Sequence, residues 1–336
     1  MLNTTLCRWY GSMYNYVLYK FKESTKEERK EMKQVIPKQS AKLLEIVNFY
    51  LNSEAFKRLK PRTQKDYELH LNYVVTTVVE GKELGAYYNK NIKVRHLTDA
   101  YEQWLQSGIR SANYRKTVLS TCWKHSMRYD VMIHDPVALV KLQKTDNRTV
   151  MWTREYVRRF LDVAYSDFKY RSIGLIVQMS YEWGQRVGDM RLLKWNALDL
   201  TECRLDIKQS KRGAEVHLPI SNNLCQMLQV QQKDFGFQDY VAPRVKPRSG
   251  AFTPYDLEEI SPIINRLLDE ANLPKELTAM DLRRTAVTEM LEAGVDIAGI
   301  RQVTGHKNMQ SVVPYMVNTF SGASKALAAR GNDEDE

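Results

Sequence analysis

The sequence predicts a mainly α-helical protein with one small β-sheet, arranged in two domains. Apolar residues recur with the period of amphipathic helices through most of the chain, and N-cap residues precede many of these segments. Alternation of apolar and polar residues, which is typical of strands, occurs at residues 204–207 and 215–220. A length of 336 residues is enough for two domains, and residues 143–149 (QKTDNRT) lack periodicity as a linker does.

We expect four helices before this linker. The first lies within residues 39–51, where apolar residues share one face. Thr63, Thr98 and Ser111 are the expected start signals of the next three helices, and Gly108 ends the third. The first half is therefore expected to be a small helical domain. Its core is expected to include two residues of the apolar helix faces, Trp104 and Trp123.

After the linker, Thr153 is expected to cap a helix, and residues 172–183 are apolar on most sides, as in a buried helix. The two alternating segments then predict a β-hairpin with its turn at Gly213. Ser221 is expected to start a further helix, which a long loop over residues 236–255 follows. This part of the chain supplies the β-sheet of the predicted fold.

Three more helices are expected toward the end of the chain. Ser261-Pro262 is expected to open the first, with the proline at the first helical position. The second covers residues 281–293 and ends at Gly294, and Asp296 caps the third, which ends at Gly305. The second half is therefore mostly helical, with one small sheet.

Composition excludes several classes of protein. The cysteines lie too far apart in the sequence for a disulfide scaffold or a zinc cluster. The first residues lack the apolar segment of a signal peptide, and no run is long enough to span a membrane. Capping or ion pairing explains Asp189, Asp199 and Asp281 more simply than a metal-ion nuclease. We therefore expect a cytoplasmic protein without cofactor, metal or membrane partner.

Positive charge is concentrated in the first half. The chain has 50 Lys and Arg against 40 Asp and Glu, and residues 1–150 hold 26 of the basic residues and 15 of the acidic ones. Such a surplus favours a polyanion partner, because each neutralised phosphate releases counterions. A solvated, Lys-rich helical surface explains the same surplus. Charge alone leaves both interpretations open.

A set of five polar residues in the second half carries the candidate chemistry: Arg186, Lys211, Arg283, His306 and Tyr315. The first arginine ends a Gly-x-Arg sequence, and the second stands within residues 281–285 (DLRRT). The histidine follows Thr304-Gly305, and the tyrosine comes nine residues after the histidine. Singly, each residue has an ordinary structural explanation, such as an ion pair or a half-buried ring. Their joint order and spacing indicate a catalytic set.

These residues resemble the catalytic pattern of the tyrosine recombinase (phage integrase) family. That pattern is G-x-R, a hairpin Lys, H-x-L-R-H-T, L-G-H and a Tyr nine residues later. The resemblance covers roughly residues 38–318 and implies a two-domain, C-shaped DNA clamp. It implies an enzyme that recombines double-stranded DNA at specific sites as a homotetramer, without metal or ATP. Accessory DNA-bending or directionality factors are further expected partners.

The resemblance also implies a division of the chain. A helical core-binding domain is expected at residues 37–142 and an α+β catalytic domain at residues 150–318, with the linker at 143–149 between them. Residues 1–36 are expected to form a basic arm or helix. Residues 319–336 are expected to form a tail whose helix docks on a neighbouring subunit and whose end is acidic.

The chemistry of strand exchange explains these residue types. A phenol, here Tyr315, can store the energy of the broken strand as a 3′-phosphotyrosyl ester. Guanidinium groups match phosphate oxygens bidentately, which is the role of Arg186 and Arg283. By resemblance, Lys211 protonates the leaving 5′ oxygen and His306 hydrogen-bonds the phosphate. Asp189 is expected to orient Arg186 or to cap its helix.

Met280 departs from the family pattern, because it occupies the position of the first histidine. A thioether neither carries a proton nor donates to phosphate. Loss of one positioned acid–base group typically lowers a rate by about 10²–10⁴. His217, on the second hairpin strand, is the one histidine that we consider as a substitute.

Three functions remain open at this point. The first is an integrase that inserts or excises a phage or mobile element through a Holliday junction. The second is a DNA-binding protein on the same scaffold that no longer cuts, an interpretation that Met280 favours. The third is a type IB topoisomerase, which uses similar chemistry without strand exchange. A covalent DNA adduct separates the second from the others, and Holliday junctions separate the first from the third.

Overall fold

The computed structural model describes residues 36–146, 148–210, 213–305 and 320–329. Contacts divide the chain into two compact units, residues 1–146 and 147–336. Their boundary falls inside residues 143–149, the segment without periodicity. Across the described ranges, no helix is both long and apolar enough to cross a lipid bilayer.

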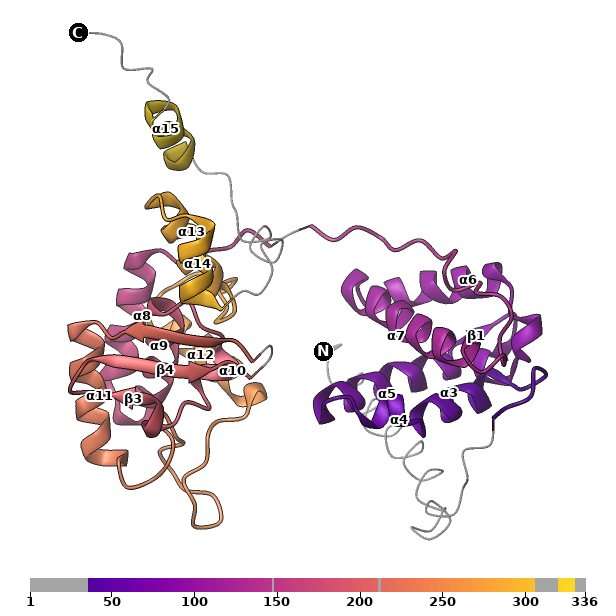
Figure 1. The fold of residues 1–336 in the computed structure, drawn as a ribbon, viewed down its shortest axis with the longest axis horizontal. Coiled ribbons are helices and arrows are strands. Elements are labelled where there is room, and N and C mark those ends of the chain that lie inside the picture. The colour runs from indigo at the N-terminus through magenta and orange to yellow at the C-terminus, as the bar shows by residue number, and fades with distance from the viewer. Residues whose placement is uncertain (1–35, 147, 211–212, 306–319, 330–336) are drawn as a thin grey trace. The chain divides into compact units, whose positions relative to one another are not determined.

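Helices that pack around one core form most of the first unit (Figure 1). Helix α7 contacts α3, α5 and α6. Trp104 and Trp123 are buried in this core, as predicted. The helices are α3 (Leu43–Leu51), α4 (Glu54–Lys57), α5 (Pro61–Thr76), α6 (Val94–Leu105) and α7 (Ile109–Met127).

Three of these helices begin earlier than the sequence pattern predicts. Pro61 fits the first position of α5 because the first helical N–H groups lack an intrahelical acceptor. At the start of α6, the backbone N–H of Lys93 donates to Nδ1 of His96 at 3.2 Å, so this turn closes without a Thr cap. The starts are Pro61 rather than Thr63, Val94 rather than Thr98, and Ile109 rather than Ser111.

One short hairpin accompanies the helices of the first unit. Strand β1 (Val78–Val79) pairs antiparallel with β2 (Lys82–Glu83), and Gly81 in the turn has a φ of 75°. The single-turn 3-10 helices η1 (Leu84–Ala86) and η2 (Asn89–Asn91) follow. Strands of two residues are too short to show alternation, which explains why the sequence did not predict them.

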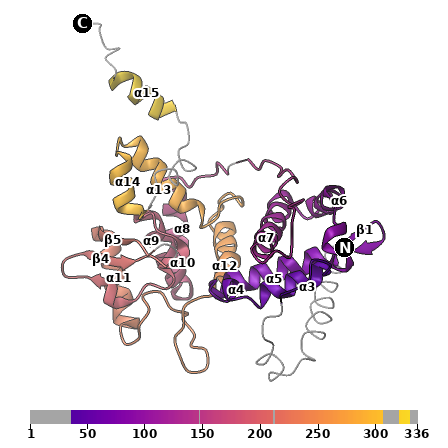
Figure 2. The ribbon, with the colours of Figure 1, turned by 45° about the vertical axis from the view of Figure 1, so that its right-hand side comes forward.

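The second unit combines a three-stranded antiparallel sheet, in the order β3-β4-β5, with helices (Figures 1 and 2). Helix α9 is buried from Ser172 to Ser180, as its apolar sequence predicts, and contacts α8, α11, α12 and α13. The elements are α8 (Arg154–Ser166), η3 (Phe168–Tyr170), α9 (Arg171–Glu182), α10 (Val187–Met190), η4 (Trp195–Ala197), β3 (Leu198–Asp199), β4 (Arg204–Lys208), β5 (Glu215–Pro219), α11 (Asn222–Phe235), α12 (Leu257–Glu270), α13 (Asp281–Glu292), α14 (Ile297–Thr304) and α15 (Phe320–Ala329).

The predicted hairpin is present as β4 and β5. Its register pairs Asp206 with His217. At its end, the backbone N–H of Gln209 donates to the carbonyl of Ala214, and that of Gly213 donates to the carbonyl of Gln209. Gly213 has a φ of 61°, so a glycine suits this position. The side chains that face the core are Leu205, Val216 and Leu218.

Most helix caps of the second unit match the prediction. Three predicted caps accept a hydrogen bond from the backbone N–H three residues later: Thr153, Ser221 and Asp296. The prediction for Ser261-Pro262 is wrong, because α12 already starts at Leu257. Asp256 and Glu259 form a reciprocal capping box there, and the proline lies inside the helix.

Candidate active site

Arg186 and Arg283 are both connected to the C-terminal end of α14. Arg186 directly precedes α10, and its side chain is 25% exposed. Arg283 lies in the first turn of α13 and is buried. The structure therefore brings together two candidate residues that are 97 positions apart in the sequence.

Backbone carbonyls hold the guanidinium group of Arg283. Its Nη1 donates to the carbonyl of Gly184 at 3.0 Å, and its Nη2 donates to the carbonyl of Thr304 at 2.8 Å. Gly184 belongs to the loop that leads into Arg186, and Thr304 is the last residue of α14. Arg283 thus connects the Gly184-Gln185-Arg186 segment to the end of α14.

Arg186 is held by neutral and acidic partners. Its Nη1 donates to Oε1 of Gln209 at 2.9 Å and lies 3.5 Å from Oδ2 of Asp189. The other oxygen of Asp189 accepts hydrogen bonds from the backbone N–H and the hydroxyl of Ser210. Asp189 therefore orients Arg186 and also anchors the hairpin, which extends the predicted role.

Gln209 joins the two arginines through one carbonyl. Its Nε2 donates to the carbonyl of Thr304 at 2.8 Å, the same oxygen that accepts from Arg283. Nε2 also donates to Oε1 of Gln185 at 2.6 Å. Gln185 in turn donates to the carbonyls of Trp183 and Val303. Both glutamines are 1% exposed, so this network lies in the interior.

Gly305 makes room for the network. It ends α14 with a φ of 66°, in the left-handed region that favours glycine. A Cβ atom at this position would lie 2.7 Å from Nε2 of Gln209. The glycine of the Thr304-Gly305 pair is therefore required for backbone geometry and for space.

The site has an exposed methionine beside it. Met280 is 84% exposed at the start of α13, three residues before Arg283. Next to it, Asp281 is buried and forms an ion pair with Arg148, whose Nε lies 2.7 Å from Oδ1. Asp281 also accepts from the backbone and hydroxyl of Thr278. Of the two roles predicted for Asp281, ion pairing is confirmed, whereas α13 has no side-chain cap hydrogen bond at its N-cap residue, Met280.

The remaining catalytic candidates, Lys211, His306 and Tyr315, lie outside the described residues. The residues that directly precede Lys211 and His306 in the sequence, Ser210 and Gly305, are described and belong to the network. Ser210 bonds Asp189, and Gly305 packs against Gln209.

His217 does not join this network. Its side chain is 63% exposed and its Nδ1 pairs with Asp206 across the hairpin. The pairing lowers the pKa of Asp206 below its usual range. Because the core-facing residues of β5 alternate with His217, its ring points to the opposite face of the sheet. In this structure, His217 therefore does not replace the histidine that the family pattern has at the position of Met280.

Sequence reasoning missed Gln209 and Gln185. Both sit beside candidates, since one precedes Ser210-Lys211 and the other precedes Arg186. A buried amide has no sequence pattern of its own, however, and their roles appear only when distant segments are placed side by side. Proximity to motif residues was the one available signal.

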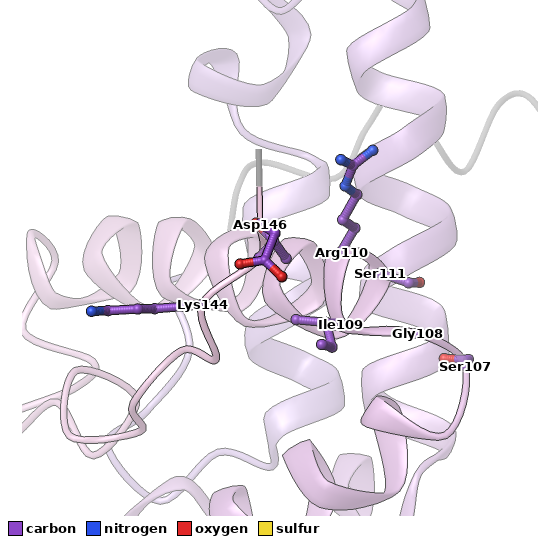
Figure 3. A pocket seen from close by; sticks show the side chains of 8 residues that line it. Ser107, Gly108, Ile109, Arg110, Ser111, Lys144 and Asp146 are labelled. Carbon is purple, nitrogen blue, oxygen red and sulfur yellow. The ribbon is translucent and has the colours of Figure 1, made fainter. Parts of the chain in front are cut away.

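Each unit has a hollow at its surface. The hollow in the first unit, about 530 Å³, lies at the start of α7 and is lined by residues 107–111 and 144–146. Figure 3 shows its cationic side chains, Arg110 and Lys144, extending in different directions, so they do not converge on one small ligand. A second hollow, about 370 Å³, lies between the α10 region and β4 and includes Asp189 and Ser210. In the described ranges, no cluster of His, Cys, Asp and Glu is arranged to hold a metal ion.

The network gives this site a defined chemical capacity. It fixes two guanidinium groups with largely neutral partners, which leaves their charge available to a phosphate. Their donors are planar and fixed in orientation, as recognition of a phosphodiester requires. A phosphoryl-transfer site is the class that this geometry supports.

The comparisons with known proteins agree with this class. A model of the phage integrase family matches residues 151–321. Tyrosine recombinase XerC of Bacillus pumilus is 23% identical over 246 residues, which cover 70% of this chain and 78% of that protein. Tyrosine recombinase XerA of Thermococcus kodakarensis is 27% identical over 175 residues, covering 52% and 60%.

Solved structures share the fold. A lambda integrase dimer bound to a COC′ core site has a TM-score of 0.68 at 18% identity, covering 88% of this chain and 80% of that one. The Tn1549 transposon integrase in complex with a circular intermediate DNA has a TM-score of 0.69 at 16% identity, covering 86% and 100%. The helical architecture with its small sheet is thus the tyrosine recombinase fold. The chain belongs to the phage integrase family, and as a tyrosine recombinase it is a site-specific recombinase of DNA.

Proposed function

We propose that this recombinase cuts and rejoins double-stranded DNA through a 3′-phosphotyrosyl link at Tyr315, and that it integrates or excises a phage or mobile element. The observation that carries the proposal is the shared carbonyl of Thr304. It connects Arg186, through Gln209, and Arg283 directly. Thr304 lies two residues before His306 in the sequence, which supports a shared site for the histidine and the two arginines.

The proposed reaction has two transfers. The phenolic oxygen of Tyr315 attacks the scissile phosphorus, and the bond to the 5′ oxygen breaks. Lys211 supplies the proton that this oxygen needs, while Arg186 and Arg283 stabilise the charge on the non-bridging oxygens. His306 hydrogen-bonds the phosphate. The 5′ hydroxyl of a partner strand then attacks the ester and releases Tyr315, so no external energy source is consumed.

We further propose a homotetramer on two DNA duplexes, with a Holliday junction as intermediate. A lambda integrase tetramer bound to a Holliday junction shares the fold, with a TM-score of 0.68, which supports this assembly. The basic surplus of residues 1–150 supports a DNA-binding role for the first domain, residues 37–142, beside the catalytic domain, residues 150–318. The segment 319–336 is proposed to dock on a neighbouring subunit.

A second role is favoured by the relatives themselves. The XerC and XerA proteins that match this chain support resolution of chromosome dimers as an alternative to integration of an element. The chemistry is the same in both cases. The position of the recombination site separates them, because an element is flanked by the sites that its integrase recombines.

The test uses nicked fragments of the DNA from which the sequence comes, so that the cleaved short strand leaves and the adduct accumulates. We expect wild-type protein to form a covalent adduct under denaturing conditions, and Tyr315→Phe to form none. Tyr88→Phe, which alters an exposed tyrosine of the first unit, serves as control and should keep the adduct. Salt-sensitive DNA binding without any adduct would instead favour the non-cutting protein. Sequencing the trapped DNA identifies the site.

A further inference from the structure

We propose that Gln209 is a positioning residue for catalysis, which sets the orientation of Arg186 relative to Arg283. The proposal rests on the proposed function, in which both arginines bind the scissile phosphate. Gln209 contacts Arg186 through Oε1 and the Thr304 carbonyl through Nε2. One rigid amide group therefore spans the distance between one arginine and the carbonyl that holds the other.

The polarity of this amide is fixed by its neighbours. Gln185 uses its Nε2 to donate to two backbone carbonyls, so it can offer Gln209 only its oxygen. The Thr304 carbonyl is also an acceptor. Both therefore require the Nε2 end of Gln209, and the Oε1 end is left to face Arg186. A flipped amide would set three oxygens against one another.

A neutral acceptor suits a phosphate-binding arginine. The oxygen of Gln209 orients the guanidinium group without cancelling its charge, whereas a carboxylate at this place would compete with the phosphate. Asp189 is the nearby carboxylate, and its closest oxygen lies 3.5 Å from Nη1 while the other oxygen bonds Ser210. Gln209 thus holds Arg186 in place and leaves it charged.

Gln209 also links the arginines to the hairpin turn. Its backbone pairs with Ala214 and Gly213 at the end of the hairpin, beside the segment that carries Lys211. Gly305 leaves the space that its amide fills. A shift of the hairpin end therefore reaches Arg186 through Gln209, in addition to the path through Ser210 and Asp189.

The test compares Gln209→Ala with a matched control, Gln231→Ala. Gln231 is equally buried in the same unit, accepts from Arg171 at 2.7 Å and donates to the Val241 carbonyl at 3.0 Å. We expect both variants to lower the melting temperature. Only Gln209→Ala should slow adduct formation on the nicked DNA, by about 10²-fold, with DNA binding unchanged.

A double-mutant comparison separates positioning from loss of stability. If Gln209 acts through Arg186, adding Gln209→Ala to Arg186→Ala should slow adduct formation no further. Gln231→Ala, which does not slow adduct formation by itself, should also leave the rate of Arg186→Ala unchanged and lower only the melting temperature. A further slowing when Gln209→Ala is added to Arg186→Ala would overturn the proposal. Gln209→Glu, which has the same shape, should be as slow as Gln209→Ala, because its charge pairs with Arg186.

A second readout does not depend on cleavage. Nitrogen NMR of labelled arginine measures rotation of the Arg186 guanidinium group, which should be restricted in wild-type protein and free in Gln209→Ala. Unrestricted rotation in wild-type protein, or restriction that persists in the variant, would overturn the positioning role. Absence of an adduct from wild-type protein would instead contradict the proposed function, so the two failures are distinguishable.

A pair of thiols in the same unit carries a second, independent inference: we infer that Cys203 and Cys225 are a disulfide-forming site. Cys203 lies in the turn between β3 and β4, and Cys225 lies in the first turn of α11. Their sulfur atoms are 3.0 Å apart. The Cys203 carbonyl accepts a hydrogen bond from the backbone N–H of Ile220, which fixes the backbone of Cys203 in place.

Glutathione disulfide is a sufficient oxidant. One thiolate attacks it and releases one glutathione thiolate, and the second thiolate then displaces the other glutathione. The two cysteines lose two electrons and two protons, and the oxidant is reduced to two glutathione thiols. The hydrogen bond between the thiols, together with burial, raises the pKa of Cys225 to about 11. The exchange should therefore quicken as the pH rises from 7 to 9.

The new bond would close a loop that contains β4, the hairpin turn and β5. After incubation with glutathione disulfide, we expect a cross-linked peptide that joins Cys203 to Cys225 and a melting temperature raised by about 5 °C. Cys122, which is fully buried, should stay reduced. Cys225→Ser should leave a stable glutathione adduct on Cys203. The same adduct on wild-type protein, without the cross-link, would overturn the inference.

Discussion

Gly305 and Gln209 fit together so closely that a single added carbon would separate them. A Cβ atom on residue 305 would lie 2.7 Å from Nε2 of Gln209, well inside contact distance. The residue at the end of α14 therefore controls a side chain that reaches it from the hairpin, almost one hundred positions earlier in the sequence.

Gly305→Ala should disrupt the site. It places an alanine in the left-handed region, which costs about 1 kcal/mol, and it displaces the Gln209 amide. We expect a lower melting temperature and a loss of adduct formation on nicked DNA. Gly294→Ala is the matched control, because Gly294 also has a positive φ but open space around it. Equal loss of cleavage in both variants would contradict this account.

Substitution by lysine should have different effects at Arg186 and at Arg283. Arg283 reaches two carbonyls with two nitrogens, and a lysine ends in one, so we expect Arg283→Lys to lower the free energy of unfolding by about 2 kcal/mol. Arg186→Lys should fold normally, because its side chain is partly exposed, yet slow cleavage by about 10²–10³-fold. Urea unfolding and adduct assays measure the two effects. A normal unfolding curve for Arg283→Lys would count against the two-carbonyl anchor.

Met280→His should raise the rate of cleavage. The side chain at this position is 84% exposed, so the fold has room for an imidazole. An imidazole supplies proton transfer, and we expect a gain of about tenfold or more. The gain should be larger at pH 6 than at pH 8, because the protonated ring is the acid. Met280→Gln, which cannot transfer a proton, is the control, and an equal gain in that variant would rule out acid catalysis.

Arg148→Ala should destabilise the second unit. Asp281 is buried, and the removal of Arg148 leaves its carboxylate with hydrogen bonds from Thr278 but without its paired charge. We expect a loss of about 2 kcal/mol in urea unfolding. Arg158→Ala removes an exposed ion pair with Glu155 and should leave stability unchanged. Equal unfolding curves for both variants would show that the Asp281 pair is not structural.

The sequence predicted much of the fold because periodicity and caps are local. Thr153, Ser221 and Asp296 were readable as caps since their partners are three residues away. The predicted helix starts were wrong where the N-cap is not a typical capping residue, as at Lys93. They were also wrong where a capping box begins the helix earlier, as at Asp256.

The candidate site, too, was predictable from the sequence only in part. Motif spacing marked Arg186 and Arg283, and the structure connects them to one carbonyl. Gln209 escaped prediction because its partners are 24 and 95 positions away, Gln185 and Thr304 respectively. Such contacts depend on tertiary placement, which no local pattern encodes.

The segment that follows the domain boundary is fastened to α13. Arg148 pairs with Asp281, and the backbone N–H and indole of Trp152 donate to Thr285 and Thr278 around the start of that helix. The same helix turn carries Arg283. A displacement of residues 148–152 would therefore act directly on the helix turn that holds Arg283, the arginine that we propose to bind phosphate. The start of the second unit and one candidate catalytic residue thus depend on the same turn of α13.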